Sequence, residues 1–203
     1  KNAVDSLSPE QRDMAEFWDD NPFKMSVTGH AMFGSKKFSP PGHWMSVVGI
    51  AAKQAKSDYA ETIYATTSTA IALFDAFIQC WYVKYKYNTV RPETVINQYI
   101  DINWRPYLQT PAFPEYTCGH STISSAAAEA LTSVYGDNFA YTDSTELEFG
   151  IANRSFKSFR HAADENNWAR FYGGLHFHNS CIISTDIGQK VGKHIATKLK
   201  MKK

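Results

Sequence analysis

Three small groups of cationic and histidine residues are the part of this sequence that points to chemistry. The groups are Lys84 with Arg91, Gly119 with His120, and Arg170 with His176. Arginine forks and lysine ammonium groups are the donors that proteins use to bind phosphate-like anions. Histidine titrates near neutral pH and can also ligate a metal. Together these residue types predict a site that holds a tetrahedral oxyanion, either phosphate or its analogue vanadate.

The first group lies in an aromatic-rich segment. Lys84 and Arg91 are seven residues apart, about two helical turns, so this spacing predicts that both side chains share one face. The tyrosines and the tryptophan around Lys84 predict that the segment is mostly buried, and a buried cation needs a partner. A bound anion would be such a partner. The alternative is an ordinary solvated basic face.

The second group stands where a helix is expected to begin. Gly119 and His120 precede a run of serine, threonine and alanine. The first turn of a helix has unpaired N–H groups and a partial positive charge, which makes it a natural anion site. The alternative is that Thr117 or Ser121 simply caps this helix and that His120 lies on the surface.

The third group brackets a glycine pair. Arg170 and His176 flank Gly173 and Gly174, a turn that can bring a side chain back towards a site. Taken alone, His176 would more often be structural. Its significance comes from its occurrence with the other two groups.

The order and spacing of the three groups resemble the signature shared by vanadium-dependent haloperoxidases and type 2 phosphatidic acid phosphatases. The matching stretches are Lys84-x6-Arg91-Pro92, Cys118-Gly119-His120 and Arg170-x5-His176. Residues 75–84, and Phe113 seven before His120, resemble the vanadium chloroperoxidase branch in particular. The similarity extends from about Pro9 to Gly192.

The resemblance implies how the anion, vanadate or phosphate, would be held. Lys84, Arg91 and Arg170 would bind its equatorial oxygens, and the Gly119 amide would add a hydrogen bond. Cys118 stands at a further anion-binding position. One pocket of this kind can serve vanadate and a phosphoryl group alike.

The resemblance also assigns the reacting groups. His176 would bond to the vanadium or attack the phosphorus, and His120 would act as acid or base on the apical oxygen. Trp81 and Phe113 are expected to be core aromatics that can also form a halide or substrate pocket beside the anion.

Three positions depart from the family pattern. Cys118 replaces a serine whose hydroxyl is the stronger donor, and Ala169 replaces the serine before the second arginine. Ser180 replaces an aspartate that would orient His176 and raise its basicity. We therefore expect a weakened site in which His176 lacks its carboxylate.

The predicted fold is an all-α helical bundle of the kind found in these two enzyme families, with residues 1–203 forming a single catalytic domain. We expect helices over residues 9–20, 41–56, 57–88, 92–101, 120–134, 145–163, 166–172 and 181–198, and a loop over residues 21–40. No strand pattern is visible. The apolar stretch 63–83 contains several polar residues, which favours a buried core helix with Asp75 hydrogen-bonded inside over a membrane span.

Net charge, cysteine count and the family resemblance limit the kinds of partner that this chain is expected to bind. A net charge of +1 in 203 residues argues against nucleic acid as a partner. Three cysteines do not make a disulfide framework.

The family resemblance implies small-molecule substrates, either halide with hydrogen peroxide or a phosphoester. Relatives in this branch carry a further helical half, so the chain is expected to be the C-terminal part of a longer one or to pair with a second subunit in a homo-oligomer. An exported or periplasmic location is the working assumption.

Three functions follow from the sequence. The first is a vanadate-dependent haloperoxidase, and the second is an acid phosphatase with a phosphohistidine at His176. The third is an oxyanion-binding domain with reduced catalysis or none, which Cys118 and Ser180 would permit.

Overall fold

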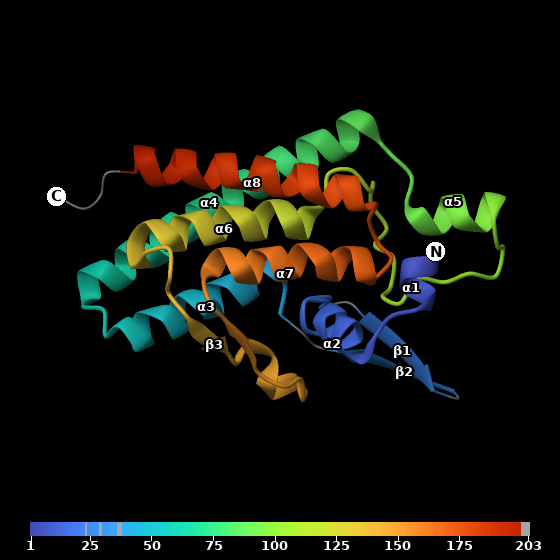
Figure 1. The fold of residues 1–203 in the computed structure, drawn as a ribbon, viewed down its shortest axis with the longest axis horizontal. Helices are drawn as coiled ribbons and strands as arrows, with labels where there is room; N and C mark the ends of the chain where they lie inside the picture. The colour runs from blue at the N-terminus through green and yellow to red at the C-terminus, as the bar shows by residue number, and fades with distance from the viewer. Residues whose placement is uncertain (23, 29, 36–37, 200–203) are drawn as a thin grey trace.

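The computed structural model describes residues 1–22, 24–28, 30–35 and 38–199. The chain forms a helical bundle with two small hairpins (Figure 1), which confirms the predicted all-α class. The elements are, in order, α1 (Asn2–Asp5), α2 (Pro9–Phe17), β1 (Lys24–Thr28), β2 (Ala31–Ser35), α3 (Pro40–Ala55), α4 (Tyr59–Tyr87), α5 (Pro92–Tyr99), α6 (Gly119–Tyr135), β3 (Tyr141–Asp143), the 3-10 helix η1 (Thr145–Phe149), β4 (Arg154–Phe156), α7 (Phe159–Tyr172) and α8 (His178–Lys198).

Helix α6 is the centre of the bundle and packs against α3, α4, α7 and α8. Its residues from Ser121 to Thr132 are all buried, and most of them are small, so the neighbouring helices can approach closely. Glycines on α8 make the closest approach. A Cβ atom at Gly188 would stand 2.1 Å from the Thr122 carbonyl oxygen, and one at Gly192 would stand 2.5 Å from that of Ala126.

Side-chain caps mark where several helices begin. Ser8 forms a capping box with Gln11, Ser39 caps α3, Asp58 caps α4 and Ser158 caps α7. Such caps satisfy amide donors that the first helical turn leaves unpaired. The predicted starts near Pro9, Asp58 and Gly119 agree with the structure to within about two residues.

The predicted loop over residues 21–40 is wrong where the structure describes it. Strands β1 and β2 pair antiparallel there, with Met25 opposite Gly34. Residues 23, 29, 36 and 37 lie outside the described part of this segment. The expectation that the chain contains no strands therefore fails.

The predicted helix over residues 145–163 is wrong up to residue 158. The chain there forms η1 and then β4, which pairs with the preceding strand β3, and α7 starts only at Phe159. The predicted separate helix over residues 166–172 is the second half of α7. Gly150 ends η1 in a left-handed conformation at φ 80°. Asp143 and Glu146 are fully buried against His43, and these tertiary contacts outweigh the local preference for helix.

Two expectations about α4 need correction. Tyr82, Tyr85 and Asp75 are exposed rather than buried. Lys84 is fully buried, but Arg91 lies beyond the helix, as the extended residue that precedes α5. The two cations therefore do not share a helix face, and Pro92 starts a new helix at a different angle. Among the described residues, no helix is long and apolar enough to cross a membrane.

One end of the bundle gathers the expected site residues. Helices α4 and α7 finish there, and α6 and α8 begin there (Figure 1). The loop of residues 100–118 closes this end. Lysine and arginine at helix ends, together with the amides of a helix start, therefore point into one region.

Candidate oxyanion site

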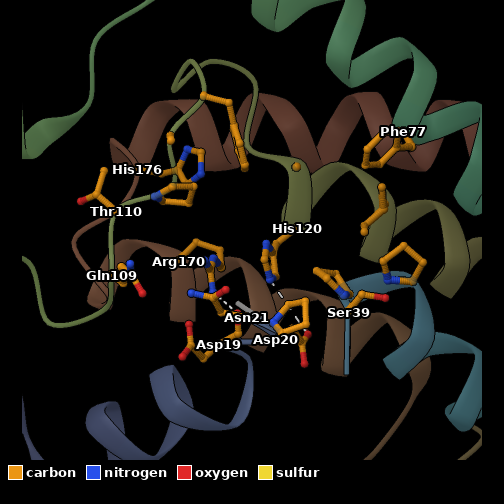
Figure 2. A pocket seen from close by; sticks show the side chains of 18 of the residues that line it. Asp19, Asp20, Asn21, Ser39, Phe77, Gln109, Thr110, His120, Arg170 and His176 are labelled. Atoms are coloured by element: carbon orange, nitrogen blue, oxygen red, sulfur yellow. Dashed lines mark hydrogen bonds and ion pairs between the residues drawn. The ribbon is translucent and has the colours of Figure 1, made fainter. Parts of the chain in front are cut away.

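A cavity of about 590 Å³ opens at this end of the bundle. Six of the predicted residues line it: Trp81, Phe113, Gly119, His120, Arg170 and His176. Figure 2 shows His120, Arg170 and His176 arranged around it. Lys84, Arg91 and Cys118 lie outside its lining. The three separated groups of the sequence therefore converge on one cavity, with some members behind its wall.

His176 is held by a partner at each ring nitrogen. Its Nδ1 lies 2.8 Å from Glu115 Oε1, and its Nε2 lies 2.9 Å from Arg91 Nη1. The carboxylate and the guanidinium together require Nδ1 to donate and Nε2 to accept. This tautomer leaves the Nε2 lone pair as the one that a metal would use.

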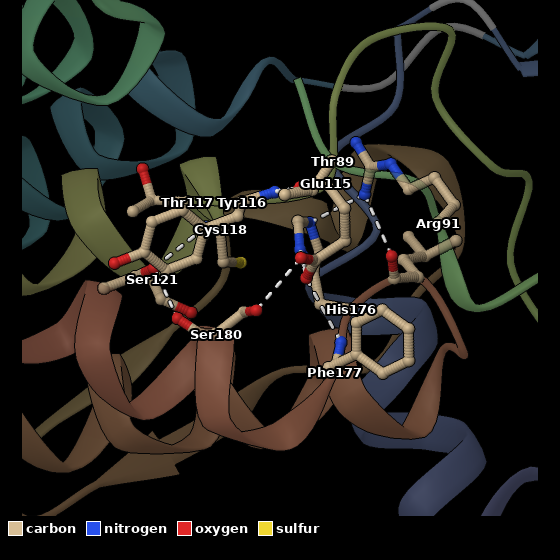
Figure 3. A network of polar contacts seen from close by, with 12 residues as sticks. Thr89, Arg91, Glu115, Tyr116, Thr117, Cys118, Ser121, His176, Phe177 and Ser180 are labelled. Atoms are coloured by element: carbon tan, nitrogen blue, oxygen red, sulfur yellow. Dashed lines mark hydrogen bonds and ion pairs between the residues drawn. The ribbon is translucent and has the colours of Figure 1, made fainter. Parts of the chain in front are cut away.

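Glu115 is the residue that sequence reasoning missed. It is 1% exposed and accepts hydrogen bonds from His176 Nδ1, the Phe177 amide and Ser180 Oγ (Figure 3). The expectation that His176 lacks a carboxylate is therefore wrong. The carboxylate comes from the loop before α6, and Ser180 supports it. An acidic residue between Pro114 and Tyr116, inside the histidine motif, was the signal available in the sequence.

Lys84 and Arg91 hold this loop through its carbonyl groups. Lys84 Nζ donates to the carbonyl oxygens of Pro114 and Glu115, at 2.7 and 2.9 Å. Arg91 donates to the carbonyl oxygens of Phe113 and Leu175, at 3.1 and 2.9 Å. Each charge lies 5.1 Å from the centre of the Phe113 ring. The two cations thus form the layer directly behind the Phe113 side of the cavity.

Burial lowers the pKa of both cations. The pKa of Lys84 falls to about 8, and that of Arg91 falls to about 10. Arg91 therefore stays charged at neutral pH, whereas Lys84 begins to lose its proton just above it. A bound anion would restore the charged form of Lys84.

Arg170 reaches the cavity from the last turn of α7. Its Nη1 donates to the carbonyl oxygen of Trp18 at 2.8 Å. Its Nε is buried and has no hydrogen-bond partner. A buried guanidinium with an unused donor is costly, and an anion in the cavity is a natural acceptor.

The first residue of α6 also faces the cavity. Gly119 lines it next to Trp81, and a Cβ atom at this position would stand 3.3 Å from the Trp81 ring. The glycine therefore lets the ring and the helix start approach each other. Cys118 precedes it, fully buried, and its amide donates to Ser184 Oγ at 2.8 Å.

His120 has a looser environment than His176. Its Nε2 is buried without a hydrogen-bond partner and lies 4.0 Å from Asp20 Oδ2. Burial, together with the charge of Arg170, holds the pKa of His120 well below its ordinary value. A neutral imidazole of this kind can accept a proton.

These residues fit the vanadate that the resemblance implies. The unused Arg170 Nε, the acceptor tautomer of His176 and the helix start at Gly119 are the donors and the ligand that a tetrahedral oxyanion needs. His176, Arg170 and Gly119 would hold the anion directly, and Arg91 and Lys84 would add charge from behind.

Comparison with known families places most of the chain in one family model. The family model described as "VCPO second helical-bundle domain" matches residues 64–103 and 100–202. No curated protein matches the chain.

Solved structures are similar over almost the whole chain. The first bacterial vanadium-dependent iodoperoxidase is 47% identical, with a TM-score of 0.88, over 96% of this chain and 45% of its own. The holo-type and apo-type bacterial vanadium-dependent chloroperoxidases are each 19% identical, with TM-scores of 0.72 and 0.71, over 97% of this chain and 45% and 46% of theirs. These two show the fold alone. The chain spans less than half the length of each of these three proteins.

Proposed function

The chain belongs to the vanadium haloperoxidase family, and from this membership we propose that it forms the catalytic bundle of a vanadate-dependent enzyme that oxidises halide with hydrogen peroxide. The observation that carries the proposal is the 47% identity to the iodoperoxidase over 96% of the chain. Because this relative is an iodoperoxidase, iodide is the halide that we propose for this chain.

The proposed overall reaction joins halide, hydrogen peroxide and one proton to give hypohalous acid and water. Vanadate, when bound, supplies the centre that takes up peroxide and opens it to attack by halide. The remaining tasks belong to side chains of this chain: holding the anion, balancing its charge and moving the proton.

His176 and Glu115 hold the anchoring point. Glu115 fixes the Nδ1–H tautomer through the 2.8 Å contact, so the Nε2 lone pair is available as the ligand. Arg91 Nη1 lies 2.9 Å from Nε2. When the anion binds at Nε2, this N–H group can donate to the anion instead. Outer partners of this kind typically contribute 10–100-fold in metal affinity, so roughly that range is expected of Glu115.

Arg170, Arg91 and Lys84 balance the charge of the anion. Each charge-assisted hydrogen bond contributes about 1.5–3 kcal/mol. Because the three side chains are buried, water screens them little. Their fixed positions also spare the enzyme the cost of reorganising solvent during the reaction.

His120 is the proposed acid and base. Its lowered pKa leaves it neutral at neutral pH, so it can take a proton from incoming peroxide and return it when hypohalous acid leaves. Groups in this role typically contribute a factor of about 10²–10⁴ in rate.

Trp81 and Phe113 form the proposed halide wall. Their ring centres lie 5.2 Å apart, and Phe77 stacks on Trp81 at 3.9 Å. A polarisable, weakly hydrated anion such as iodide suits an aromatic wall next to buried cations.

The test uses purified protein incubated with vanadate. Oxidation of iodide, bromide and chloride by peroxide is measured beside hydrolysis of a phosphoester, and bound vanadium is quantified. We expect iodide oxidation that requires vanadate and that phosphate inhibits by competition. Phosphoester hydrolysis without halide oxidation would favour the phosphatase alternative, and vanadate binding without either activity would favour the binding-domain alternative.

A further inference from the structure

A second polar cluster lies directly behind the cavity wall, centred on His43 of α3. His43 is 0% exposed. Its Nδ1 lies 2.8 Å from Asp20 Oδ1, and its Nε2 lies 3.0 Å from Asp143 Oδ2. Glu146 Oε1 is 3.7 Å from Nδ1. Nothing in the proposed function uses this histidine.

The two contacts define the charge of His43. A neutral imidazole has one N–H and one lone pair, and a lone pair facing a carboxylate oxygen at 3 Å would be repelled. With a carboxylate at both nitrogens, the stable form is the imidazolium. Although burial by itself would lower it, the carboxylates of Asp20 and Asp143 raise the pKa of His43 to about 10. The indole of Trp18 stacks on the ring at 4.6 Å and fixes its plane.

A proton satisfies this cluster better than a metal ion does. Asp20, His43 and Glu146 present ligand atoms within 4.8 Å of one another. Both ring nitrogens, however, are at hydrogen-bond distance from carboxylates, which leaves neither lone pair for a cation. The charge of the imidazolium also offsets part of the charge of the buried carboxylates, as buried ions require.

Asp20 connects this cluster to the cavity. It lines the cavity and is 2% exposed. One carboxylate oxygen accepts from His43, while the other, Oδ2, has no hydrogen-bond partner and lies 4.0 Å from His120 Nε2 (Figure 2). The unused oxygen therefore faces the unused nitrogen, at about 1 Å beyond hydrogen-bond length.

We propose that His43 is a positioning residue for His120: a buried imidazolium that holds the Asp20 carboxylate where it can accept the Nε2–H of His120. His120 would then exchange its proton at its other ring nitrogen, Nδ1. When Nδ1 takes a proton from a substrate O–H, the Nε2–H stays on nitrogen and its hydrogen bond to Asp20 shortens. When Nδ1 returns the proton, the bond relaxes. The role of His43 in turnover rests on the proposed function, whereas the effect of His43 and Asp20 on the pKa of His120 does not.

The arrangement predicts opposite effects of two substitutions on His120. Asp20→Asn removes the carboxylate that lies 4.0 Å from Nε2, so the pKa of His120 should fall further. His43→Gln removes the buried positive charge that offsets Asp20, while the glutamine amide can still donate to that carboxylate, so the pKa of His120 should rise. Arg170, His176, Cys118 and the backbone of Asp19 also act on His120, and neither variant replaces any of these residues.

The experiment is a histidine-selective ¹⁵N NMR titration of vanadate-free protein. At pH 8 the wild type should show both ring nitrogens of His43 protonated. The pKa of His120 should move in opposite directions in the two variants, by at least about half a pH unit each. His161→Gln, which removes an exposed histidine from α7, is the matched control and should change neither signal.

Two results would overturn the proposal. One is a His43 that carries a single ring proton at pH 8. The other is a folded His43→Gln variant in which the titration of His120 is unchanged. If His43→Gln does not fold, the wild-type spectrum and the Asp20→Asn variant decide the question. Because the titration needs no vanadate, absence of halide oxidation would count against the proposed function alone. In an active enzyme, His43→Gln should shift the pH profile of kcat while the KM for halide stays the same.

Discussion

His176 and His120 face the same cavity but are held in different ways. His176 has a carboxylate at 2.8 Å and a guanidinium at 2.9 Å, so its tautomer and orientation are defined before any ligand arrives. His120 has its nearest carboxylate at 4.0 Å and a lowered pKa. A residue that ligates benefits from a fixed lone pair, whereas a residue that shuttles protons must accommodate two protonation states. The difference shows that one site can fix the ring of one histidine by two hydrogen bonds and leave the ring of the other without a close carboxylate partner.

The sharpest test of this difference is to remove each histidine in turn. His176→Ala should abolish measurable vanadate binding in calorimetric titrations. His120→Ala should keep the affinity within a few-fold while lowering halide turnover by about 10²–10⁴-fold. If both variants lost vanadate affinity to the same extent, the division of roles would be wrong.

The arginines should affect binding more than the proton step. Arg91→Ala and Arg170→Ala should each weaken vanadate or phosphate binding by at least about tenfold, because each removes a charge-assisted pair that contributes about 1.5–3 kcal/mol. Arg105→Ala, which removes an exposed arginine from the loop of residues 100–118, is the control. Unchanged affinity in either site variant would remove that arginine from the site.

Glu115 is expected to act on His176 alone. Glu115→Gln should lower vanadate affinity by about 10–100-fold, the usual contribution of an outer partner, and should leave the titration of His120 unchanged. Ser180→Asp should weaken the site rather than restore it, because a second carboxylate would lie beside the buried Glu115. Ser180→Ala is the control that removes the hydroxyl without adding charge. An improved Ser180→Asp enzyme would contradict the assignment of Glu115.

The smallest expected effect is the pH dependence contributed by Lys84. With a pKa of about 8, its charge is present below pH 8 and is lost above it. The advantage of wild type over Lys84→Met in phosphate affinity should therefore shrink by about tenfold between pH 7 and 9, because the charged fraction falls by that factor. Phosphate affinities measured across this range would show it. A constant advantage would mean that Lys84 keeps its proton throughout.

Much of the site could be predicted from local sequence. The alternation of capping residues, apolar runs, proline and glycine marks the helices and their ends, because these signals act within one or two turns. Clustering of lysine, arginine, glycine and histidine at such ends indicated an oxyanion site. Figure 1 shows why this works: α4 and α7 end where α6 and α8 begin.

The tertiary structure alone decided which groups support the two histidines. Glu115 reaches His176 across 61 residues, and His43 reaches Asp143 across 100 residues. Such pairings depend on how loops close over the bundle, and no local spacing encodes them. The same long-range contacts turned the predicted helix near Glu146 into η1 and a hairpin. Sequence by itself determined most of the helices and the chemical class of the site, because those follow from short-range propensities and residue type. The tertiary structure determined tautomers, charges and partners, because burial and distance set those quantities.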